Sequence, residues 1–305
     1  MIGATVLDRR ALAELLEAER LRVDRELEAI AADAGRRVPA SLAEAVAYAL
    51  STSGKRLRPI LAMAAYRAVG GRETEPAYRL SCALEIVHTY SLVHDDLPCM
   101  DDDDVRRGRP TVHRVYGTPV ATLAGAALLP LAIAVLDGGA RDLGLYDAVR
   151  AHLIGELCRA AGAVGMVGGQ LRDLEGESAP VDGAGLESIH RAKTGALLTA
   201  ALRIGAIAGG ASDEALEALT RYGSALGLAF QITDDVLDVV GNAEALGKAA
   251  GRDEHLRKAS YPALFGLDGA RTLARARADE AKDALAGLRS AELVALADYV
   301  VERER

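Results

Sequence analysis

The chain has 305 residues, 50% of them hydrophobic and 26% charged, a composition that excludes a disordered protein. Nine tyrosines, two phenylalanines and no tryptophan argue against a β-sandwich or barrel, whereas abundant alanine and leucine favour helices. The net charge of −8 argues against a nucleic-acid or anionic-membrane surface, because such surfaces are basic. We therefore predict an all-α protein that binds no nucleic acid.

The cysteines and the first residues bear on the cellular compartment. Cys82, Cys99 and Cys158 lack the paired spacing of a disulfide framework or a zinc site. Residues 1–10 carry three charged side chains where a signal peptide has its apolar stretch. We expect a cytoplasmic protein.

Helical periodicity begins near the N-terminus and recurs along the chain. Ser41-Leu-Ala-Glu44 has the form of a capping box that opens the second helix. Helices are predicted over 7–34, from Ser41, and over 57–69, 77–97, 120–136, 146–161, 186–207 and 213–240, with two more after Pro262. No strand pattern competes, and turn-rich connections are predicted at 105–119, 176–185 and 241–260. Since no linker or repeat divides the chain, we predict one domain over residues 1–305.

Residues 115–136 contain no charge, and such a segment is long enough to cross a bilayer. Glycine, proline and many alanines give it little apolar bulk, and no second segment of this kind follows. We interpret it as a buried core helix and expect no membrane span.

The first of two acidic clusters is Asp95-Asp96-Leu-Pro-Cys-Met-Asp101-Asp-Asp-Asp104, at the end of an apolar helix. Asp95 and Asp101 would diverge on a straight helix. Pro98 should break the helix, which would let Asp101 return toward Asp95.

The second cluster lies in Phe230-Gln-Ile-Thr-Asp-Asp-Val-Leu-Asp-Val-Val240, where Asp234 and Asp238 lie one helical turn apart on one face. Unpaired carboxylates are costly to bury among apolar side chains, so cations must compensate them. Oxygen ligands without His or Cys indicate Mg²⁺, which prefers to share its shell with phosphates. Two facing clusters therefore predict a bound diphosphate.

Basic residues accompany the acids in chain order. They are Lys55, Arg56 and Arg58 in Gly-Lys-Arg-Leu-Arg-Pro, then Arg106, Arg107 and Arg109, then Lys193, and finally Lys248 and Lys258. His88 shares the helix face of Asp95 two turns earlier, and we interpret it as a phosphate donor rather than a packed core residue. Such a set could hold two diphosphates and their metals.

These motifs closely resemble those of short-chain trans-prenyl diphosphate synthases, above all the bacterial farnesyl diphosphate synthases, from about Ser41 to the C-terminal Ala-Asp-Tyr-Val-Val. The motifs occur in the family's order: Gly-Lys-Arg-Leu-Arg-Pro, His-Thr-Tyr-Ser-Leu-Val-His-Asp-Asp-Leu-Pro-Cys-Met-Asp, Arg-Arg-Gly-Arg-Pro-Thr, Gly-Gly-Gln-Leu-Arg-Asp-Leu, Lys-Thr-Gly-Ala-Leu, Gln-Ile-Thr-Asp-Asp-Val-Leu-Asp and Lys-x-Ser-Tyr-Pro. The resemblance implies a single helical bundle of the isoprenoid synthase type with a central cavity.

The resemblance also implies roles for individual residues. The implied ligands of a cluster of three Mg²⁺ ions are Asp95, Asp101, Asp234 and Asp238. The implied contacts of the allylic diphosphate are Arg106, Lys193, Thr194, Gln231 and Lys248. Isopentenyl diphosphate would contact Lys55, Arg58, His88 and Arg107. Asp95, Asp101, Asp234 and Lys193 would be catalytic, and Lys258 and the C-terminal arginines are further candidates.

The implied reaction is a head-to-tail condensation of isopentenyl diphosphate with dimethylallyl or geranyl diphosphate, catalysed by a homodimer. Tyr90 and Ser91 lie one turn before Asp95, where the floor of the product tail is expected. In this family a bulky residue there accompanies a C15 product, which predicts farnesyl diphosphate, with geranylgeranyl diphosphate as the alternative.

Three other classes of protein share some of these features. A class I terpene cyclase has a similar acidic motif but ordinarily lacks the Lys55 and Arg58 site. A non-catalytic subunit of a heteromeric synthase has usually lost the paired acids, which are intact here. A membrane prenyltransferase needs many spans, and this chain has one candidate at most.

Overall fold

The computed structural model describes residues 7–36, 38–176, 181–246, 260–288 and 290–303. Almost all elements in these ranges are helices, which confirms the all-α prediction. The α-helices are α1 Arg9–Gly35, α2 Ala40–Leu50, α3 Leu57–Ala68, α4 Glu75–Asp95, α5 Val112–Tyr116, α6 Thr118–Asp142, α7 Asp147–Ala161, α8 Met166–Gly176, α9 Gly183–His190, α10 Ala196–Ala208, α11 Asp213–Leu246, α12 Tyr261–Ala284 and α13 Ala291–Glu302. A π-helical turn, Arg191–Gly195, joins α9 to α10.

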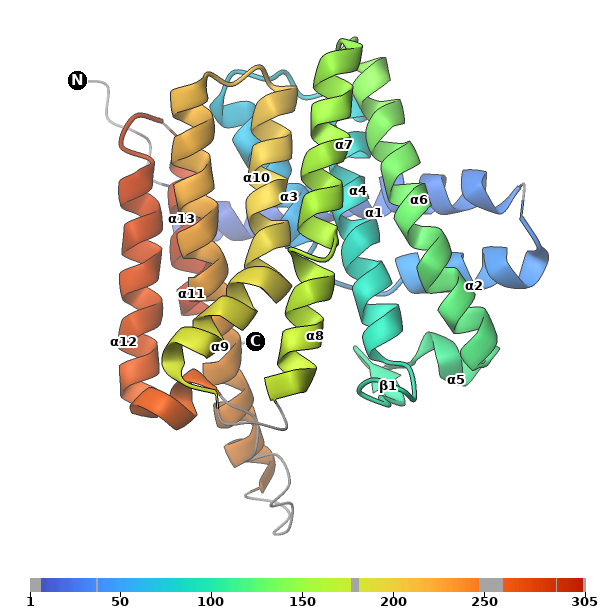
Figure 1. Ribbon diagram of the computed structural model, residues 1–305. Helices are drawn as coiled ribbons and strands as arrows, with labels where there is room; N and C mark the ends of the chain where they lie inside the picture. The colour runs from blue at the N-terminus through green and yellow to red at the C-terminus, as the bar shows by residue number, and fades with distance from the viewer. Residues whose placement is uncertain (1–6, 37, 177–180, 247–259, 289, 304–305) are drawn as a thin grey trace.

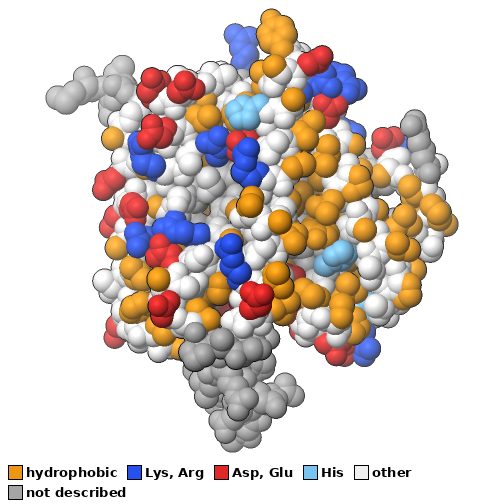
Figure 2. Space-filling model, viewed as in Figure 1, with side chains coloured by type: hydrophobic (Ala, Val, Ile, Leu, Met, Phe, Trp, Pro, Cys, Tyr) orange, Lys and Arg blue, Asp and Glu red, His pale blue; other side chains and the backbone are white. Residues whose placement is uncertain are grey.

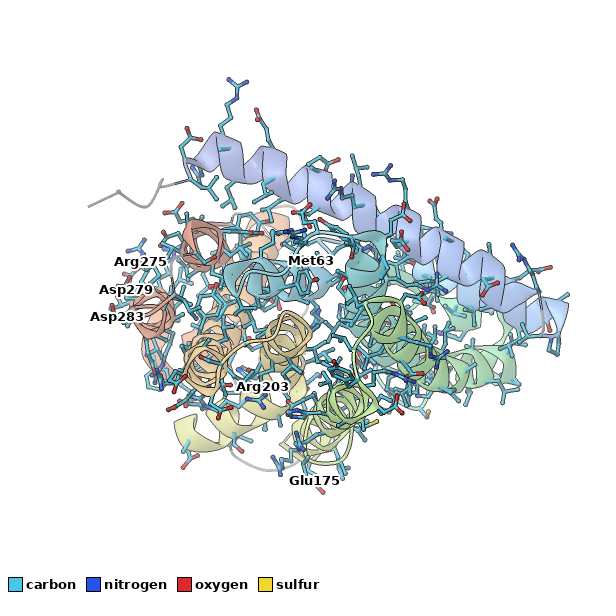
Figure 3. The ribbon with its side chains drawn as sticks, turned by 90° about the horizontal axis from the view of Figure 1, so that it is seen from above. Met63, Glu175, Arg203, Arg275, Asp279 and Asp283 are labelled. Atoms are coloured by element: carbon cyan, nitrogen blue, oxygen red, sulfur yellow. The ribbon has the colours of Figure 1, made fainter. Side chains whose placement is uncertain are left out.

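The long helices form a bundle in which neighbours in space are often distant in sequence (Figure 1). α4 packs along α6, α11 along α12, and α10 lies against α3, α7 and α11. Seen from above, α1 lies across one side of the bundle, whereas Arg203 on α10 and Glu175 on α8 mark the opposite side (Figure 3). The elements that carry the acidic clusters, α4 and α11, are thus parts of one bundle.

Helix α12 shows how the sequence pattern produces this packing. Beyond Tyr261 at its start, its buried side chains are small and recur at helical spacing, at Ala270, Ala274, Ala278 and Ala281. Arg275, Asp279 and Asp283 occupy the outer face (Figure 3). The hydroxyl of Ser260 accepts a hydrogen bond from the Ala263 N–H and so caps the start of the helix.

The structure differs from the sequence prediction at several boundaries. Helix α2 begins at Ala40 after Pro39, and no side chain caps it, so the capping box predicted at Ser41 is wrong. The helix starts one residue earlier than predicted, so Ser41 is its second residue and does not occupy the cap position. Helix α8 was not predicted, and α11 continues into the stretch predicted as a turn-rich connection.

The stretch 105–119 is also more ordered than predicted. It contains a hairpin of two short strands, β1 Val105–Arg106 and β2 Arg109–Pro110, followed by α5. The two residues between the strands, Arg107 and Gly108, both have positive φ, as a tight two-residue hairpin requires. Strands of two residues are too short to produce an alternating sequence pattern.

Helix α6 is not enclosed as predicted. It is the one helix in the described ranges that is long and apolar enough to cross a membrane, yet only 39% of its most apolar window is buried. The buried face packs against α4, whereas Leu123 on the other face is 63% exposed. In Figure 2, hydrophobic side chains gather over this helix. The expectation of a buried core helix therefore holds for the face of α6 that packs against α4 and is wrong for the opposite face.

Candidate active site

The first acidic cluster lies where α4 ends. The helix stops at Asp95, and Pro98 prevents its continuation. The Asp101 N–H donates to the Asp95 carbonyl oxygen at 2.8 Å, so the chain folds back as predicted. Burial raises the pKa of Asp95 to about 6, and Asp101 adds to this rise while Lys193 opposes it. Asp95 and Asp101 thus form a concentration of negative charge that the chain compensates only in part.

Asp96, the second member of the pair, has a different environment. Its carboxylate is buried and accepts a hydrogen bond from Nε of Arg106. Arg106 also donates to Asp103 at 3.0 Å. The arginine predicted to contact the allylic diphosphate is therefore held beside the first cluster by two carboxylates.

The π-helical turn presents the next two predicted residues. Nζ of Lys193 lies 2.6 Å from Oδ2 of Asp173 on α8, and the Thr194 hydroxyl donates to Gln231 on α11 at 2.8 Å. Turns of this kind are frequent at functional sites because they change the direction of side chains within a helix. Lys193 and Thr194 therefore join the π-helical turn to α8 and to α11, the helix that carries the second cluster.

Glycine makes the approach of α8 to this turn possible. A side chain at Gly169 would overlap the backbone of Lys193. Gly169 and Asp173 belong to Gly-Gly-Gln-Leu-Arg-Asp-Leu, a motif for which the sequence predicted no role. Asp173, the acid at the sixth position of this motif, was the signal in the sequence from which a partner of Lys193 could have been predicted.

The second acidic cluster lies on α11. Burial raises the pKa of Asp234, and Asp238 adds to the rise while Arg303 opposes it. The side chain of Arg303 is 3% exposed and donates to Asp234 at 2.6 Å and to the Phe230 carbonyl oxygen at 3.0 Å. Its guanidinium also lies over the Phe230 ring. A C-terminal arginine thus acts as the counterion of a predicted metal ligand.

Asp235 has different hydrogen-bond partners from Asp234. It accepts the Tyr261 N–H at 3.0 Å and a weaker contact from Gln231 at 3.4 Å. Burial raises its pKa to about 6, which these two donors oppose. Asp235 therefore joins α11 to the start of α12.

Four predicted cationic or basic residues gather near the second cluster. Burial, Arg58 and Arg107 together lower the pKa of His88 well below its usual value. Burial lowers the pKa of Lys55, as do Arg303 and Arg107, while Asp234 opposes the change. In the described part of the chain, the buried Nε of Arg58 has no hydrogen-bond partner. These groups form an electropositive patch adjoining the second acidic cluster.

The remaining predicted basic residues either lie outside the described ranges or have a structural role. Lys248 and Lys258 lie outside the described residues. Arg109 lies over the Tyr48 ring and donates to Ser51, so its role is structural.

Tyr90 and Ser91, predicted to form the floor of the product tail, lie on the last turns of α4. The Tyr90 and His94 rings meet edge to face at 4.8 Å, and His94 contacts the Thr122 carbonyl oxygen on α6 at 3.1 Å. A side chain at Gly125 would overlap the His94 ring. The Ser91 hydroxyl donates to the His88 carbonyl oxygen. Tyr90 is thus held by a histidine that is itself fixed to the neighbouring helix.

The carboxylates of both clusters are the candidate ligands of a metal ion. In the ranges that the structure describes, no three metal-ligating side chains converge on one point. Mg²⁺ tolerates such an arrangement, because it keeps several waters and takes one or two carboxylates together with substrate phosphates. The donors are all hard oxygens, and burial together with Asp101 raises the pKa of Asp95, so a cation bound there would stabilise its ionised form. The residues therefore fit magnesium that binds together with a diphosphate.

Comparison with known proteins identifies the family. The sequence matches the family model for polyprenyl synthetase over residues 39–291. The chain belongs to the polyprenyl synthetase family. It is similar to the heterodimeric geranylgeranyl pyrophosphate synthase large subunit 1 of Arabidopsis thaliana, with 45% identity over 275 residues covering 88% of this chain and 74% of that protein. It is 47% identical over 268 residues to the dimethylallyltranstransferase of Fischerella ambigua, covering 87% and 77% of the two chains.

The fold of this polyprenyl synthetase is similar to that of a solved relative. The crystal structure of an FPP/GFPP synthase from Zymomonas mobilis matches with a TM-score of 0.80 and 35% identity, covering 95% of this chain and 98% of that one. The predicted family and the predicted isoprenoid synthase fold are confirmed, and the protein is a prenyltransferase.

Proposed function

We propose that the protein condenses isopentenyl diphosphate with dimethylallyl and geranyl diphosphate to give farnesyl diphosphate. The observation that carries this proposal is the arrangement of acidic and basic side chains in the site. Asp95 is close enough to Asp101 and Lys193 for both to shift its pKa, and Arg303, Lys55 and Arg58 act in the same way on Asp234. Two acidic groups, each with its own cations, suit one metal-bound diphosphate and a second diphosphate bound by basic side chains.

The first task is to break the carbon–oxygen bond of the allylic substrate. Negative charge grows on the departing diphosphate, and Lys193, Thr194 and Arg106 would stabilise it by charge and hydrogen bonding. Asp173 would hold Lys193 in place through their 2.6 Å contact. Mg²⁺ held by Asp95, Asp101, Asp234 and Asp238 would supply further positive charge to the leaving group when bound.

The second task is to orient the other substrate. Lys55, Arg58, His88 and Arg107 would bind the diphosphate of isopentenyl diphosphate and aim its double bond at the allylic cation. The new carbon–carbon bond forms as the double bond attacks, and loss of a proton restores a neutral product chain. The departing diphosphate is the proposed proton acceptor.

Tyr90 supports a C15 product. Its ring is half-buried one turn before Asp95 and rests against His94, so it would block further growth of the tail. Geranylgeranyl diphosphate is the second candidate, because several similar proteins, including the Arabidopsis thaliana subunit, are named for that product. The fixed aromatic ring favours the shorter product.

We also propose that the protein is a homodimer. α6 presents an exposed apolar face that carries Leu123, Ala126, Pro130 and Ala134 at helical spacing. Exposed apolar faces of this kind are typical of subunit interfaces. The similar Arabidopsis thaliana protein is named as part of a heterodimer, so a second chain of another kind is the competing partner.

The test is product analysis with the purified protein. It is incubated with isopentenyl diphosphate, Mg²⁺ and either dimethylallyl or geranyl diphosphate, and the dephosphorylated products are separated by chromatography. Farnesol from both starters is expected. Asp234→Ala should abolish it, whereas Asp268→Ala on the exposed face of α12 should not. A product that forms without isopentenyl diphosphate would indicate a cyclase, and an inactive wild-type chain would indicate a non-catalytic subunit.

A further inference from the structure

Arg56, which immediately precedes α3, is constrained in both its backbone and its side chain. Its φ of 50° and ψ of 32° lie in the left-handed region, which residues other than glycine rarely adopt. Its side chain is only 4% exposed although it carries a charge. Such a conformation persists only where surrounding interactions hold it in place.

Four acceptors hold the guanidinium. Nε donates to Asp24 on α1 at 2.7 Å, and Nη1 donates to Glu85 on α4 at 3.0 Å. Nη2 donates to the carbonyl oxygens of Thr52 at 2.8 Å and Leu50 at 3.3 Å. Arg56 therefore ties the segment before α3 to two helices and to the end of α2.

The same segment carries or contacts three of the four groups proposed to bind isopentenyl diphosphate. Lys55 is partly covered but far more exposed than the buried Arg56, so consecutive side chains leave the backbone toward different surroundings. Arg58 follows in the first turn of α3. The Ser53 carbonyl oxygen accepts a hydrogen bond from Nη1 of Arg107 at 2.7 Å. A shift of this segment would therefore move Lys55 and Arg58 and release Arg107 from one of its contacts.

We infer that Arg56 is a positioning residue that holds Lys55, Arg58 and Arg107 in register for the diphosphate of isopentenyl diphosphate. This inference rests on the proposed function. Arg56 itself would not touch the substrate, because its nitrogens are committed to acceptors of the chain. A planar guanidinium can serve four acceptors in three directions, whereas a lysine at this position is a single point charge and cannot.

The experiment measures binding without turnover. Isopentenyl diphosphate is titrated by calorimetry, in buffer with EDTA, into wild type, Arg56→Lys and Lys55→Gln. Both variants are expected to raise Kd, Arg56→Lys by about tenfold, because three ligands lose their alignment together. In turnover assays with Mg²⁺, Arg56→Lys should raise KM for isopentenyl diphosphate by a similar factor and leave KM for geranyl diphosphate within about twofold.

Arg67 at the other end of α3 provides a matched control. It too is an arginine bound to a carboxylate on α1, Glu19, and to one on another helix, Glu292. Arg67→Lys should lower the melting temperature as Arg56→Lys does, but it should leave isopentenyl diphosphate binding unchanged. If Arg56→Lys fails to fold, Asp24→Ala removes one of the four acceptors at a position that is 25% exposed, and a rise in Kd is again expected.

Two results would overturn the role of Arg56. One is unchanged isopentenyl diphosphate affinity in Arg56→Lys while Lys55→Gln weakens it. The other is equal weakening by Arg67→Lys, which would reduce the effect to a general loss of stability. A wild-type protein that binds isopentenyl diphosphate but makes no product would refute the proposed function and leave the binding test of Arg56 intact.

Discussion

Asp95→Asn should stabilise the metal-free protein while abolishing its activity. Burial raises the pKa of Asp95 from 3.8 to about 6, so the folded protein binds this proton more tightly than the unfolded chain. At pH 8 the carboxylate is ionised in both states, and the folded state carries the cost of a buried, partly compensated charge. Asparagine keeps the shape of the protonated acid without that charge.

The expected change in unfolding free energy follows from the pKa shift of Asp95. A rise from 3.8 to about 6 corresponds to about 3 kcal/mol of unfolding free energy lost when the group ionises. Because the folded-state pKa is raised, the contribution of Asp95 to wild-type stability should fall as pH rises from about 4 to 7 and remain low above that range. Asp95→Asn should therefore exceed wild type by up to about 3 kcal/mol at pH 8, and the difference should shrink toward pH 4.

The assay is urea unfolding in EDTA at pH 4.5 and pH 8. Asp268→Asn is the control, since its side chain is 99% exposed and its removal should change stability by less than about 0.5 kcal/mol. Mg²⁺ with inorganic diphosphate should stabilise wild type more than Asp95→Asn, because binding to the folded state adds to stability. Equal or lower stability of Asp95→Asn at pH 8 would show that the chain already compensates this carboxylate, which would undermine the argument for a metal there.

Three further variants test other parts of the site. Tyr90→Ala should shift the main product beyond C15 in chromatography of the dephosphorylated alcohols, and unchanged C15 would exclude Tyr90 as the floor. Asp173→Ala should raise KM for the allylic substrate by about tenfold through loss of the contact that holds Lys193, with KM for isopentenyl diphosphate unaffected. Equal changes in both constants would contradict that assignment. Leu123→Arg should convert a homodimer to monomers in sedimentation equilibrium, and a variant that stays dimeric would place the interface elsewhere.

Most helices could be predicted because their apolar residues recur at helical spacing and alanine favours helix. Helix α8 was missed because Gly168 and Gly169 weaken its helical propensity. The structure explains Gly169, since a side chain there would overlap the backbone of Lys193. A tertiary contact thus overrode local propensity, and only the three-dimensional structure shows the contact.

The acidic and basic residues of the site were evident from their type and order, but their partners were not. Arg303 lies 69 positions from Asp234, and their contact depends on how the C-terminal helix packs along α11. Arg56 had the same appearance in sequence as its neighbours Lys55 and Arg58, yet it is the buried one. Sequence motifs indicate which residues carry charge, whereas burial decides whether a charge holds the fold or faces a substrate.

The difference between charges that hold the fold and charges that face a substrate also accounts for the adjacent pairs of aspartates in both clusters. Asp96 binds Arg106, and Asp235 accepts the Tyr261 N–H, so the second acid of each pair serves the scaffold. Lys193 and Lys55 lower the pKa values of Asp95 and Asp234 respectively, and Asp234 also accepts a hydrogen bond from Arg303. A pair of adjacent acids on a helix cannot point at one ligand, because neighbouring positions diverge by about 100°. The second acid therefore has to serve another partner, and in the first cluster it fixes the hairpin that carries Arg106 and Arg107.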